Sequence, residues 1–279
     1  MRILGFMPAL LRDPAILAGL VSLLAMIMFS LTGLLLTPWD PNLIRGDPLS
    51  PPSLAHPLGT DDIGRDVAAM IYRGILTSIF IGVSAAIITT ILALIVGIIA
   101  SIFKGFIDAV LMRIIDFLLA TPSLVLALIL IAFLKPSIYN VVLVLAITGW
   151  PGVARIVRAH SLQILSTGYV EAARALGASS WHIALKHLVP ASIPVALASI
   201  VTTTRAAILL EAGLGFLGLS DPSTISLGTI LFYARRSAAL ASGAWWVIVP
   251  AGLLITIIVF ALTMISIGIE SRTLKREYR

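Results

Sequence analysis

The stretch ILTSIFIGVSAAIITTILALIVGIIASIF, residues 75–103, carries no charged side chain over about 29 residues. A helix needs about 20 apolar residues to cross a hydrocarbon core of about 30 Å, so this run is long enough to span a membrane and must tilt or protrude from it. The composition agrees, because 59% of the 279 residues are hydrophobic and only 11% are charged, whereas about a quarter are charged in soluble domains. The sequence therefore predicts an all-α, polytopic membrane protein.

Five further apolar runs complete a set of six predicted transmembrane helices, at residues 15–37, 109–134, 138–157, 191–219 and 245–269. The first of these is too long for the core of a signal peptide and is interpreted as a retained span. A kink is expected at Pro122, because proline cannot continue a regular helix, and a break is expected at the GWPG sequence of residues 149–152. Six spans place both chain termini on the same side of the membrane.

The basic residues predict which side that is. With both termini in the cytoplasm, about twice as many Lys and Arg residues fall inside as outside, as the positive-inside rule requires. Trp39, Trp245 and Trp246 then lie at the outer boundaries of their spans, where amphipathic rings are favoured. The sequence therefore predicts a multi-pass protein of the cell membrane with both termini cytoplasmic.

Several classes of function are not supported by the sequence. The net charge of +6 does not indicate a nucleic-acid partner, because the positive charges cluster at the ends of apolar runs. The chain has no cysteine, and His182 and His187 do not have the i,i+4 spacing that would place two ligands on one helical face, so no metal site is expected. There is no Gly-Lys dipeptide, so the phosphate-binding Walker A loop is absent. No catalytic cluster is readable, and the chain is not expected to be an enzyme.

A glycine-rich sequence, GLGFLG at residues 213–218, matches the spacing of dinucleotide-binding loops. It lies at the end of an apolar span rather than between a strand and a helix, so dinucleotide binding is not expected. The glycines instead favour close helix packing or local unwinding near the outer surface.

The longest polar excursion on the cytoplasmic side is EAARALGASSWHIALKHLVP, residues 171–190. It predicts a short helix that begins near Gly168 and ends at Gly177, since glycine readily adopts the left-handed conformation that terminates helices. Ser179, or the serine after it, can cap a second short helix, and Pro190 is expected to begin the next span. The first helix, about 12 Å long, is too short to be stable alone in water. It must therefore dock, either in a groove of a partner or against its own membrane domain.

On the outer side, HPLGTDDIGRDVAAMIYRG, residues 56–74, precedes the longest span. Thr60 can cap a helix whose first turn holds two acidic residues, which are favourable at the positive end of the helix dipole. Apolar residues from Ile63 to Gly74 follow one face and charged residues follow the other. The pattern predicts an amphipathic helix lying at the outer membrane surface, either as a simple anchor or as a contact site.

Two ionisable residues, Arg205 and Glu211, interrupt the fifth span. Charges in lipid are costly and by default indicate a functional site. The two residues lie about 240° apart around the helix and cannot pair on one face. We expect at least one of them to face a translocation path or to make a polar contact with another helix. At the start of the third span, Arg113 and Asp116 are expected to pair with i,i+3 spacing.

The cytoplasmic loop also resembles a family signature. Glu171-Ala172-Ala173, then Gly177, then Pro190 at their spacing are similar to the EAA signature of ABC-importer permeases. The outer segment resembles the outer motif of the dipeptide, oligopeptide and nickel permease group. Further matches to that group are MRIIDFLLATPSLVL (112–126), YVEAARALG (169–177) and EAGLGFLGLSDP (211–222). Together the resemblance covers about residues 56–265.

That resemblance implies an ABC importer type I permease fold in three parts. Residues 1–74 would hold the N-terminal transmembrane helix and an extracytoplasmic segment with the amphipathic helix. Residues 75–270 would form a core of five transmembrane helices with a cytoplasmic coupling loop at about 158–190, and residues 271–279 a cytoplasmic tail.

The resemblance also implies roles for individual residues. The coupling loop would dock on an ATPase through Tyr169, Glu171, Ala172, Ala173, Leu176, Gly177 and Pro190. The candidates for contact with a substrate-binding protein are Asp61, Asp62, Arg65 and Asp66. Glu211 and Arg205 remain the candidates for the translocation path.

The implied partners are a second, related permease subunit, two ABC ATPase subunits and an extracytoplasmic substrate-binding protein, assembled in the plasma membrane of a prokaryote. ATP and Mg²⁺ would bind to the ATPase subunits, and this chain would hold no cofactor. The implied function is the ATP-driven import of peptides. The same architecture importing nickel or oligosaccharides is one alternative, and an ion-coupled secondary transporter or channel is another.

Overall fold

The structure, a computed structural model, describes residues 13–37, 40–237, 239 and 241–277. These ranges contain no β-strand, only two isolated β-bridges within one loop. The helices are α2 (Pro14–Leu36), α3 (Val67–Ile102), α4 (Phe106–Ala120), α5 (Ser123–Ala132), α6 (Ile138–Leu165), α7 (Gly168–Ala175), α8 (Ser180–Ile183), a π-helical turn (Ala184–Leu188), α9 (Val189–Phe216), α10 (Leu227–Arg236) and α11 (Trp245–Glu277).

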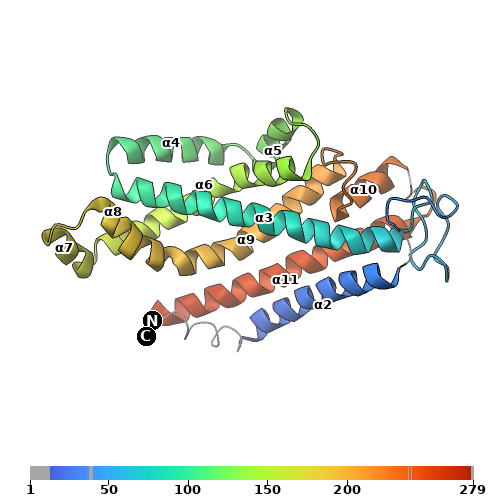
Figure 1. Ribbon diagram of the computed structural model, residues 1–279, viewed down its shortest axis with the longest axis horizontal. Helices are drawn as coiled ribbons and strands as arrows, with labels where there is room; N and C mark the ends of the chain where they lie inside the picture. The colour runs from blue at the N-terminus through green and yellow to red at the C-terminus, as the bar shows by residue number, and fades with distance from the viewer. Residues whose placement is uncertain (1–12, 38–39, 238, 240, 278–279) are drawn as a thin grey trace.

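The long helices run back and forth along one axis (Figure 1). α2, α3, α6, α9 and α11 are each long and apolar enough to cross a membrane, and the bent pair α4 and α5 makes a sixth crossing when it is counted as one broken span. α7 lies at one end of the bundle, toward which the first residues of α2 and the last turns of α11 also point, whereas α10 and the loop of residues 40–66, the outer loop, lie at the opposite end (Figure 1). The predicted six-span, all-helical architecture is confirmed.

α3 contains the charge-free run and explains why that run exceeds one membrane thickness. Its 36 residues extend about 54 Å at 1.5 Å per residue, whereas the hydrocarbon core is about 30 Å thick. At the outer-loop end, Val67, Met70 and Ile71 are fully buried beneath that loop and α10. The helix is therefore longer than one membrane thickness, as the sequence predicts.

The third span is sharply broken rather than gently kinked. α4 and α5 meet at an angle of 93°, and Thr121 and Pro122 between them have extended ψ angles. Proline disfavours helical geometry at the residue before it, which accounts for the position of the break. The predicted kink at Pro122 is confirmed, and α5 is displaced sideways from the bundle.

The predicted break at residues 149–152 is wrong, because α6 continues through Pro151 without interruption. Proline removes one intrahelical hydrogen bond, and neighbouring helices can satisfy the carbonyls that this frees. The carbonyl that Pro151 frees is that of Ile147, and at the adjacent residue Thr89 Oγ1 of α3 donates to the carbonyl oxygen of Ala146 at 3.3 Å. The fourth span thus extends to Leu165 instead of ending near residue 157.

Pro190 likewise does not begin a separate helix. Val189 is helical, and its N–H donates to the carbonyl oxygen of Ala184 across the π-helical turn. A π turn widens the helix by one residue, and this allows the chain to pass a proline whose ring would otherwise clash with the preceding turn. α8, the π turn and α9 therefore form one continuous apolar helix, Ser180–Phe216.

The predicted amphipathic helix capped by Thr60 is also wrong. Residues 60–66 form part of the outer loop, and α3 begins at Val67. Thr60 Oγ1 is used within the loop, where it accepts a hydrogen bond from the N–H of Ser50 at 2.8 Å and donates one to the carbonyl oxygen of Asp47 at 2.6 Å. Asp66 caps the helix instead, accepting from the N–H of Ala69 at 2.7 Å. The apolar face expected at the membrane surface is the buried start of α3.

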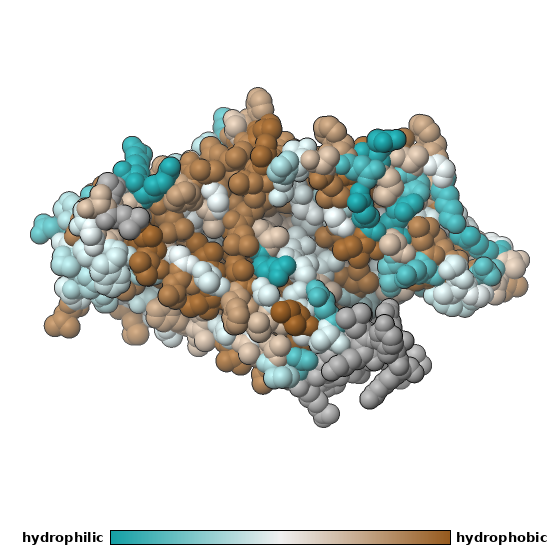
Figure 2. All heavy atoms as spheres, turned by 180° about the vertical axis from the view of Figure 1, so that it is seen from behind, coloured by the Kyte–Doolittle hydropathy of each residue, from teal (hydrophilic) through white to brown (hydrophobic). Residues whose placement is uncertain are grey.

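The surface and the core agree with a membrane location. Figure 2 shows apolar residues across the middle of one face, with polar residues concentrated toward the two ends. Three buried apolar clusters lie along the bundle, one beneath the outer loop, one between α3, α5, α6 and α9, and one next to α7. α11 continues to Glu277 through most of the predicted tail; residues 1–12, Trp39 and residues 278–279 lie outside the described residues.

Candidate functional site

α7 ends in a Schellman motif built on Gly177. This glycine has φ = +87°, a left-handed conformation that other residues rarely adopt. The N–H of Gly177 donates to the carbonyl oxygen of Arg174 at 2.9 Å, and the N–H of Ala178 donates to that of Ala173 at 3.0 Å. These two bonds are the pair that defines the motif. The predicted helix end is confirmed, and Ser179 caps α8 as expected, accepting from the N–H of His182 at 3.2 Å.

α7 buries one side chain against the bundle. Val170 is the only buried residue among its eight residues, all of them described. It packs with Ile164 of α6 and with Ile183 and Leu188, which lie in the helix that leads into α9. Any displacement of α7 therefore acts on both α6 and α9.

The rest of α7 faces outward. Leu176 is 90% exposed and Tyr169 is 54% exposed. Glu171 and Ala172 are exposed and Ala173 is partly exposed. Pro190, at the start of α9, is exposed as well. The predicted docking residues thus all lie on accessible surface. Pro190 differs from the others only in belonging to α9.

Aromatic side chains that sequence reasoning missed flank α7. The Trp181 ring is 58% exposed and meets Phe103, at the end of α3, with ring centroids 5.8 Å apart. The Tyr169 ring lies 5.6 Å from that of His187. Leu185, 67% exposed in the π turn, adds an apolar side chain. The sequence signal available for this surface was the presence of two large apolar residues, Trp181 and Leu185, within a polar loop.

In the outer loop, two of the four predicted contact residues pair with each other. Arg65 Nε donates to Asp61 Oδ2 at 2.7 Å, and the Arg65 N–H donates to Asp61 Oδ1 at 2.8 Å. Asp61 is fully buried, and the Arg65 guanidinium lies 4.4 Å from the centroid of the Tyr233 ring in α10. Gly64, with φ = +87°, makes the turn that brings the two residues together. This ion pair therefore attaches the outer loop to α10.

Asp66 is equally enclosed. Besides capping α3, its Oδ2 lies 2.7 Å from His56 Nδ1. Trp246 of α11 donates from Nε1 to the Thr60 carbonyl oxygen at 3.2 Å, which fixes the loop from a third side. Of the four predicted contact residues, Asp62 alone is partly exposed. Burial and the neighbouring Asp61 carboxylate raise the pKa of Asp62 above its ordinary value.

Glu211 and Arg205 both make polar contacts with other helices, one of the two outcomes expected for them. Ser226 Oγ donates to Glu211 Oε1 at 2.6 Å, and Ser78 Oγ donates to Oε2 at 3.1 Å. Ser226 caps α10, and Ser78 belongs to α3, so a fully buried carboxylate joins three helices. Arg205 Nη1 donates to Thr263 Oγ1 of α11 at 3.3 Å. The two residues do not meet, as expected.

The predicted Arg113–Asp116 pair is wrong, because Asp116 pairs with Arg155 of α6 instead. A second bridge lies nearby, where Arg158 donates to both Asp108 oxygens, Nε to Oδ1 at 2.7 Å and Nη2 to Oδ2 at 2.6 Å. Bidentate pairs of this kind are the strong ones. Two acidic residues of α4 thus hold α4 to two arginines of α6.

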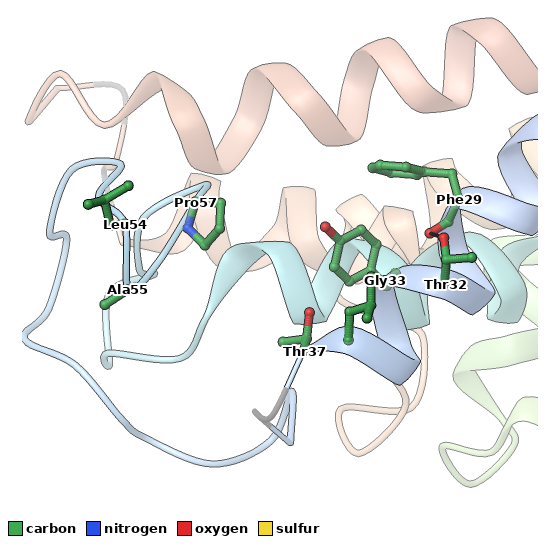
Figure 3. Close-up of a pocket in the computed structure, with 9 residues that line it drawn as sticks. Phe29, Thr32, Gly33, Thr37, Leu54, Ala55 and Pro57 are labelled. Carbon is green, nitrogen blue, oxygen red and sulfur yellow. Dashed lines mark hydrogen bonds between the residues drawn. The ribbon is translucent and has the colours of Figure 1, made fainter.

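Two cavities of the described part of the chain lie close to these features. One, of about 580 Å³, lies between the end of α2 and the outer loop; Figure 3 shows Phe29, Thr32 and Thr37 on α2 facing Leu54 and Pro57 of the loop. None of its lining residues is charged. The other, of about 430 Å³, lies between α5, α6 and α9. Neither Glu211 nor Arg205 lines either of these cavities.

Comparison with known proteins places these features in a family. The family described as "Binding-protein-dependent transport system inner membrane component" matches residues 93–275. The chain is 38% identical over 267 residues to the dipeptide transport system permease protein DppC of Escherichia coli (strain K12), a match that covers 93% of this chain and 88% of DppC. It is 34% identical over 258 residues to the oligopeptide transport system permease protein OppC of Bacillus subtilis (strain 168), covering 91% of this chain and 83% of OppC.

A solved structure shares the fold. The chain is similar to a chain of the MetNI methionine ABC transporter in an inward-facing conformation, with a TM-score of 0.55 and 21% identity over 71% of this chain and 94% of that chain. The likeness concerns the helical architecture and agrees with the crossings traced in Figure 1. The chain therefore belongs to the family of binding-protein-dependent transport system inner membrane components and is a membrane-spanning permease subunit of an ABC importer.

Proposed function

We propose that this permease imports short peptides that an extracytoplasmic binding protein delivers, driven by ATP hydrolysis on separate subunits. The relatives DppC and OppC are named for dipeptide and oligopeptide transport and align with more than nine-tenths of this chain, which supports peptides as the cargo. The chain has no Gly-Lys dipeptide and hence no Walker A loop. ATP and Mg²⁺ would therefore bind to two ATPase partners, with a second, related permease completing the membrane part.

The exposed α7 is the observation that carries the proposal. A helix of eight residues whose one buried side chain is Val170, with Leu176 almost fully exposed beside it, has too few contacts of its own to be stable without a partner. A groove on the ATPase would cover Leu176, Tyr169 and the small residues Ala172 and Ala173. The small side chains permit close approach of the two surfaces.

The buried contacts of α7 would transmit its displacement to the membrane-spanning helices. When the ATPases close, their grooves would carry α7, and Val170 would pass the displacement to α6 and to the continuous helix that contains α9. Rigid helices that rock together around a central path produce alternating access. The excess of Lys and Arg on the α7 side supports placing α7 and both termini in the cytoplasm.

At the other end of the bundle, the outer loop would receive the binding protein. Asp61, Arg65 and Asp66 are enclosed by their own chain, so their role would be to hold the loop in shape, whereas Asp62 would make direct contact.

Replacement of Leu176 by alanine tests the proposal. Burying a leucine side chain contributes about 1.5–3 kcal/mol, so Leu176→Ala should weaken ATPase binding by about ten- to a hundredfold. The complex would be purified through this chain, and the retained ATPase and the ATP-dependent uptake of labelled Ala-Ala into proteoliposomes would be measured.

Leu54→Ala is the matched control, because Leu54 is fully exposed at the opposite end of the bundle. It should retain the ATPase. Undiminished ATPase retention and uptake in Leu176→Ala would contradict docking through α7.

A further inference from the structure

The cavity between α5, α6 and α9 lies at mid-membrane depth. Thr148 lies about 15 Å from the start of α6 and Thr203 about 20 Å from the end of α9, by the helical rise, and both line the cavity. Ser123, the first residue of α5, lines it directly after the break at Pro122. The 93° bend thus opens a space of about 430 Å³ halfway along the bundle.

Two of the three hydroxyl groups of this cavity differ from those next to them, whereas the third, on Thr148, donates to the carbonyl oxygens of Val144 at 3.0 Å and Leu145 at 3.1 Å. Of three consecutive threonines in α9, Thr202 donates to the carbonyl oxygen of Ser199 at 3.0 Å and Thr204 to that of Ile200 at 2.7 Å. Such bonds to the preceding turn are how a threonine in a helix is ordinarily satisfied. The hydroxyl group of Thr203, the one of the three that lines the cavity, has no hydrogen-bond partner in the described part of the chain, and the same holds for the Ser123 hydroxyl group across from it.

A lipid tail is a poor occupant of this cavity. Interrupted backbone at membrane depth is tolerated only where protein buries it or where it lines a water-filled space. The chain is interrupted at Thr121 and Pro122, beside this cavity, and the cavity presents hydroxyl groups from three helices. None of its lining residues, all within the described ranges, is charged. The chemistry fits a neutral ligand that accepts and donates hydrogen bonds.

We propose that this cavity is a cargo-contact site on the translocation path, where Ser123, Thr148 and Thr203 hydrogen-bond the amide groups of a passing peptide. The proposal rests on the function proposed above and identifies which part of the peptide this chain contacts. Hydroxyl groups both donate and accept, so they suit the C=O and N–H of any peptide. A cavity wall that has no charged residue contacts the main chain of the peptide and does not select among charged peptide side chains. Glu211 and Arg205 are then positioning residues outside the path.

Two substitutions test the site by transport. A lost net hydrogen bond corresponds to about a three- to tenfold change in affinity, so Thr203→Val should raise the KM for Ala-Ala uptake by that factor in proteoliposomes holding the complete complex. Ala206 is exposed and lines the cavity, so Ala206→Phe should obstruct it and lower the maximal rate while ATPase retention stays normal. Both effects should be equal for Ala-Ala, Asp-Ala and Lys-Ala.

Matched controls separate the cavity from general effects of the substitutions. Thr202→Val removes the neighbouring hydroxyl that faces its own helix, and Ala25→Phe adds the same bulk at an exposed position of α2. Both should transport like the wild-type chain. A Thr203→Val or Ala206→Phe variant that transports all three peptides normally would overturn the inference.

Water access gives an independent measurement, because the natural chain has no cysteine. Thr203→Cys should react with a charged, membrane-impermeant methanethiosulfonate reagent, and Ala-Ala with its binding protein should slow the reaction. Thr256→Cys, on the exposed face of α11, should stay unreacted in lipid. If a helix of the second permease or a lipid tail fills the cavity, Thr203→Cys will also stay unreacted, and the inference fails. Absence of ATP-dependent peptide uptake by the wild-type complex would instead overturn the proposed function.

Discussion

Single residues show how burial changes the interpretation of a charge. Glu211 interrupts an apolar span, and this made it a candidate for the translocation path. Its carboxylate is fully buried and accepts hydrogen bonds from Ser78 and Ser226, so it joins three helices of the bundle. Asp61 is a second example. It was a candidate for contact with a substrate-binding protein, but its charge is satisfied by Arg65 inside the outer loop.

Gly177 provides the residue-scale prediction. A left-handed conformation costs an L-residue about 1–2 kcal/mol, and a β-branched side chain more. A Cβ at this position meets no atom within 4 Å, so Gly177→Val strains the backbone of the exposed loop without disturbing the core. We expect normal membrane insertion and an unchanged Tm, but ATP hydrolysis that continues with little peptide uptake. Gly168→Ala, also without a neighbour within 4 Å and in a helical position, should transport normally; coupled uptake in Gly177→Val would contradict the role of this turn.

At the scale of helices, close backbone approach explains the glycine-rich end of α9. A Cβ on Gly215 would lie 2.9 Å from the backbone carbon of Gly228, and one on Gly228 would lie 2.8 Å from the Cα of Ala212. α9 and α10 therefore cross in contact, and this brings the Ser226 cap of α10 onto Glu211. The close packing expected for residues 213–218 is confirmed at Gly215.

Gly228→Ala should separate α9 from α10. The added methyl group meets backbone atoms that cannot rotate away, and overpacking of this kind costs about 1–3 kcal/mol. We expect a lower Tm for the purified chain in detergent, measured by thermal unfolding. Gly252→Ala in α11 is the control, because no atom lies within 4 Å of a Cβ there, and it should be neutral or slightly stabilising. Equal Tm values for Gly228→Ala and the wild-type chain would contradict the crossing.

At the scale of the whole molecule, the two ends of the bundle carry different structures. The α7 end presents a short, loosely held helix, and the other end presents an outer loop fixed by Arg65, Asp66 and Trp246 (Figure 1). A movable element at one end and a rigid platform at the other suit a protein that receives cargo on one side and mechanical force on the other.

The orientation of these two ends is testable with single cysteines. In right-side-out spheroplasts, a membrane-impermeant maleimide should label Leu54→Cys directly and Leu176→Cys only after permeabilisation, since both side chains are highly exposed and the chain has no other cysteine. Labelling of Leu176→Cys in intact spheroplasts would reverse the topology and contradict ATPase docking at α7.

Features that depend on short stretches of chain could be predicted from the sequence. The six crossings follow from the length of apolar runs, because lipid leaves the backbone few alternatives to a helix. The break at Pro122 and the turn at Gly177 follow from the conformational limits of one residue and its neighbours. The exposure of the predicted docking residues of α7 follows from the polarity and shortness of that loop.

The tertiary structure decided every feature in which distant segments compete for the same atom. Thr60 had the character of a helix cap, but Ser50 and Asp47 occupy its hydroxyl and Asp66 caps α3 instead. Asp116 pairs with Arg155 of another helix in preference to Arg113 in its own, and the cavity beside Thr203 exists only because α5, α6 and α9 meet around it. The physical reason is that apolar length and backbone freedom are properties of a segment, whereas a hydrogen bond or a cavity requires the positions of groups from several segments at once.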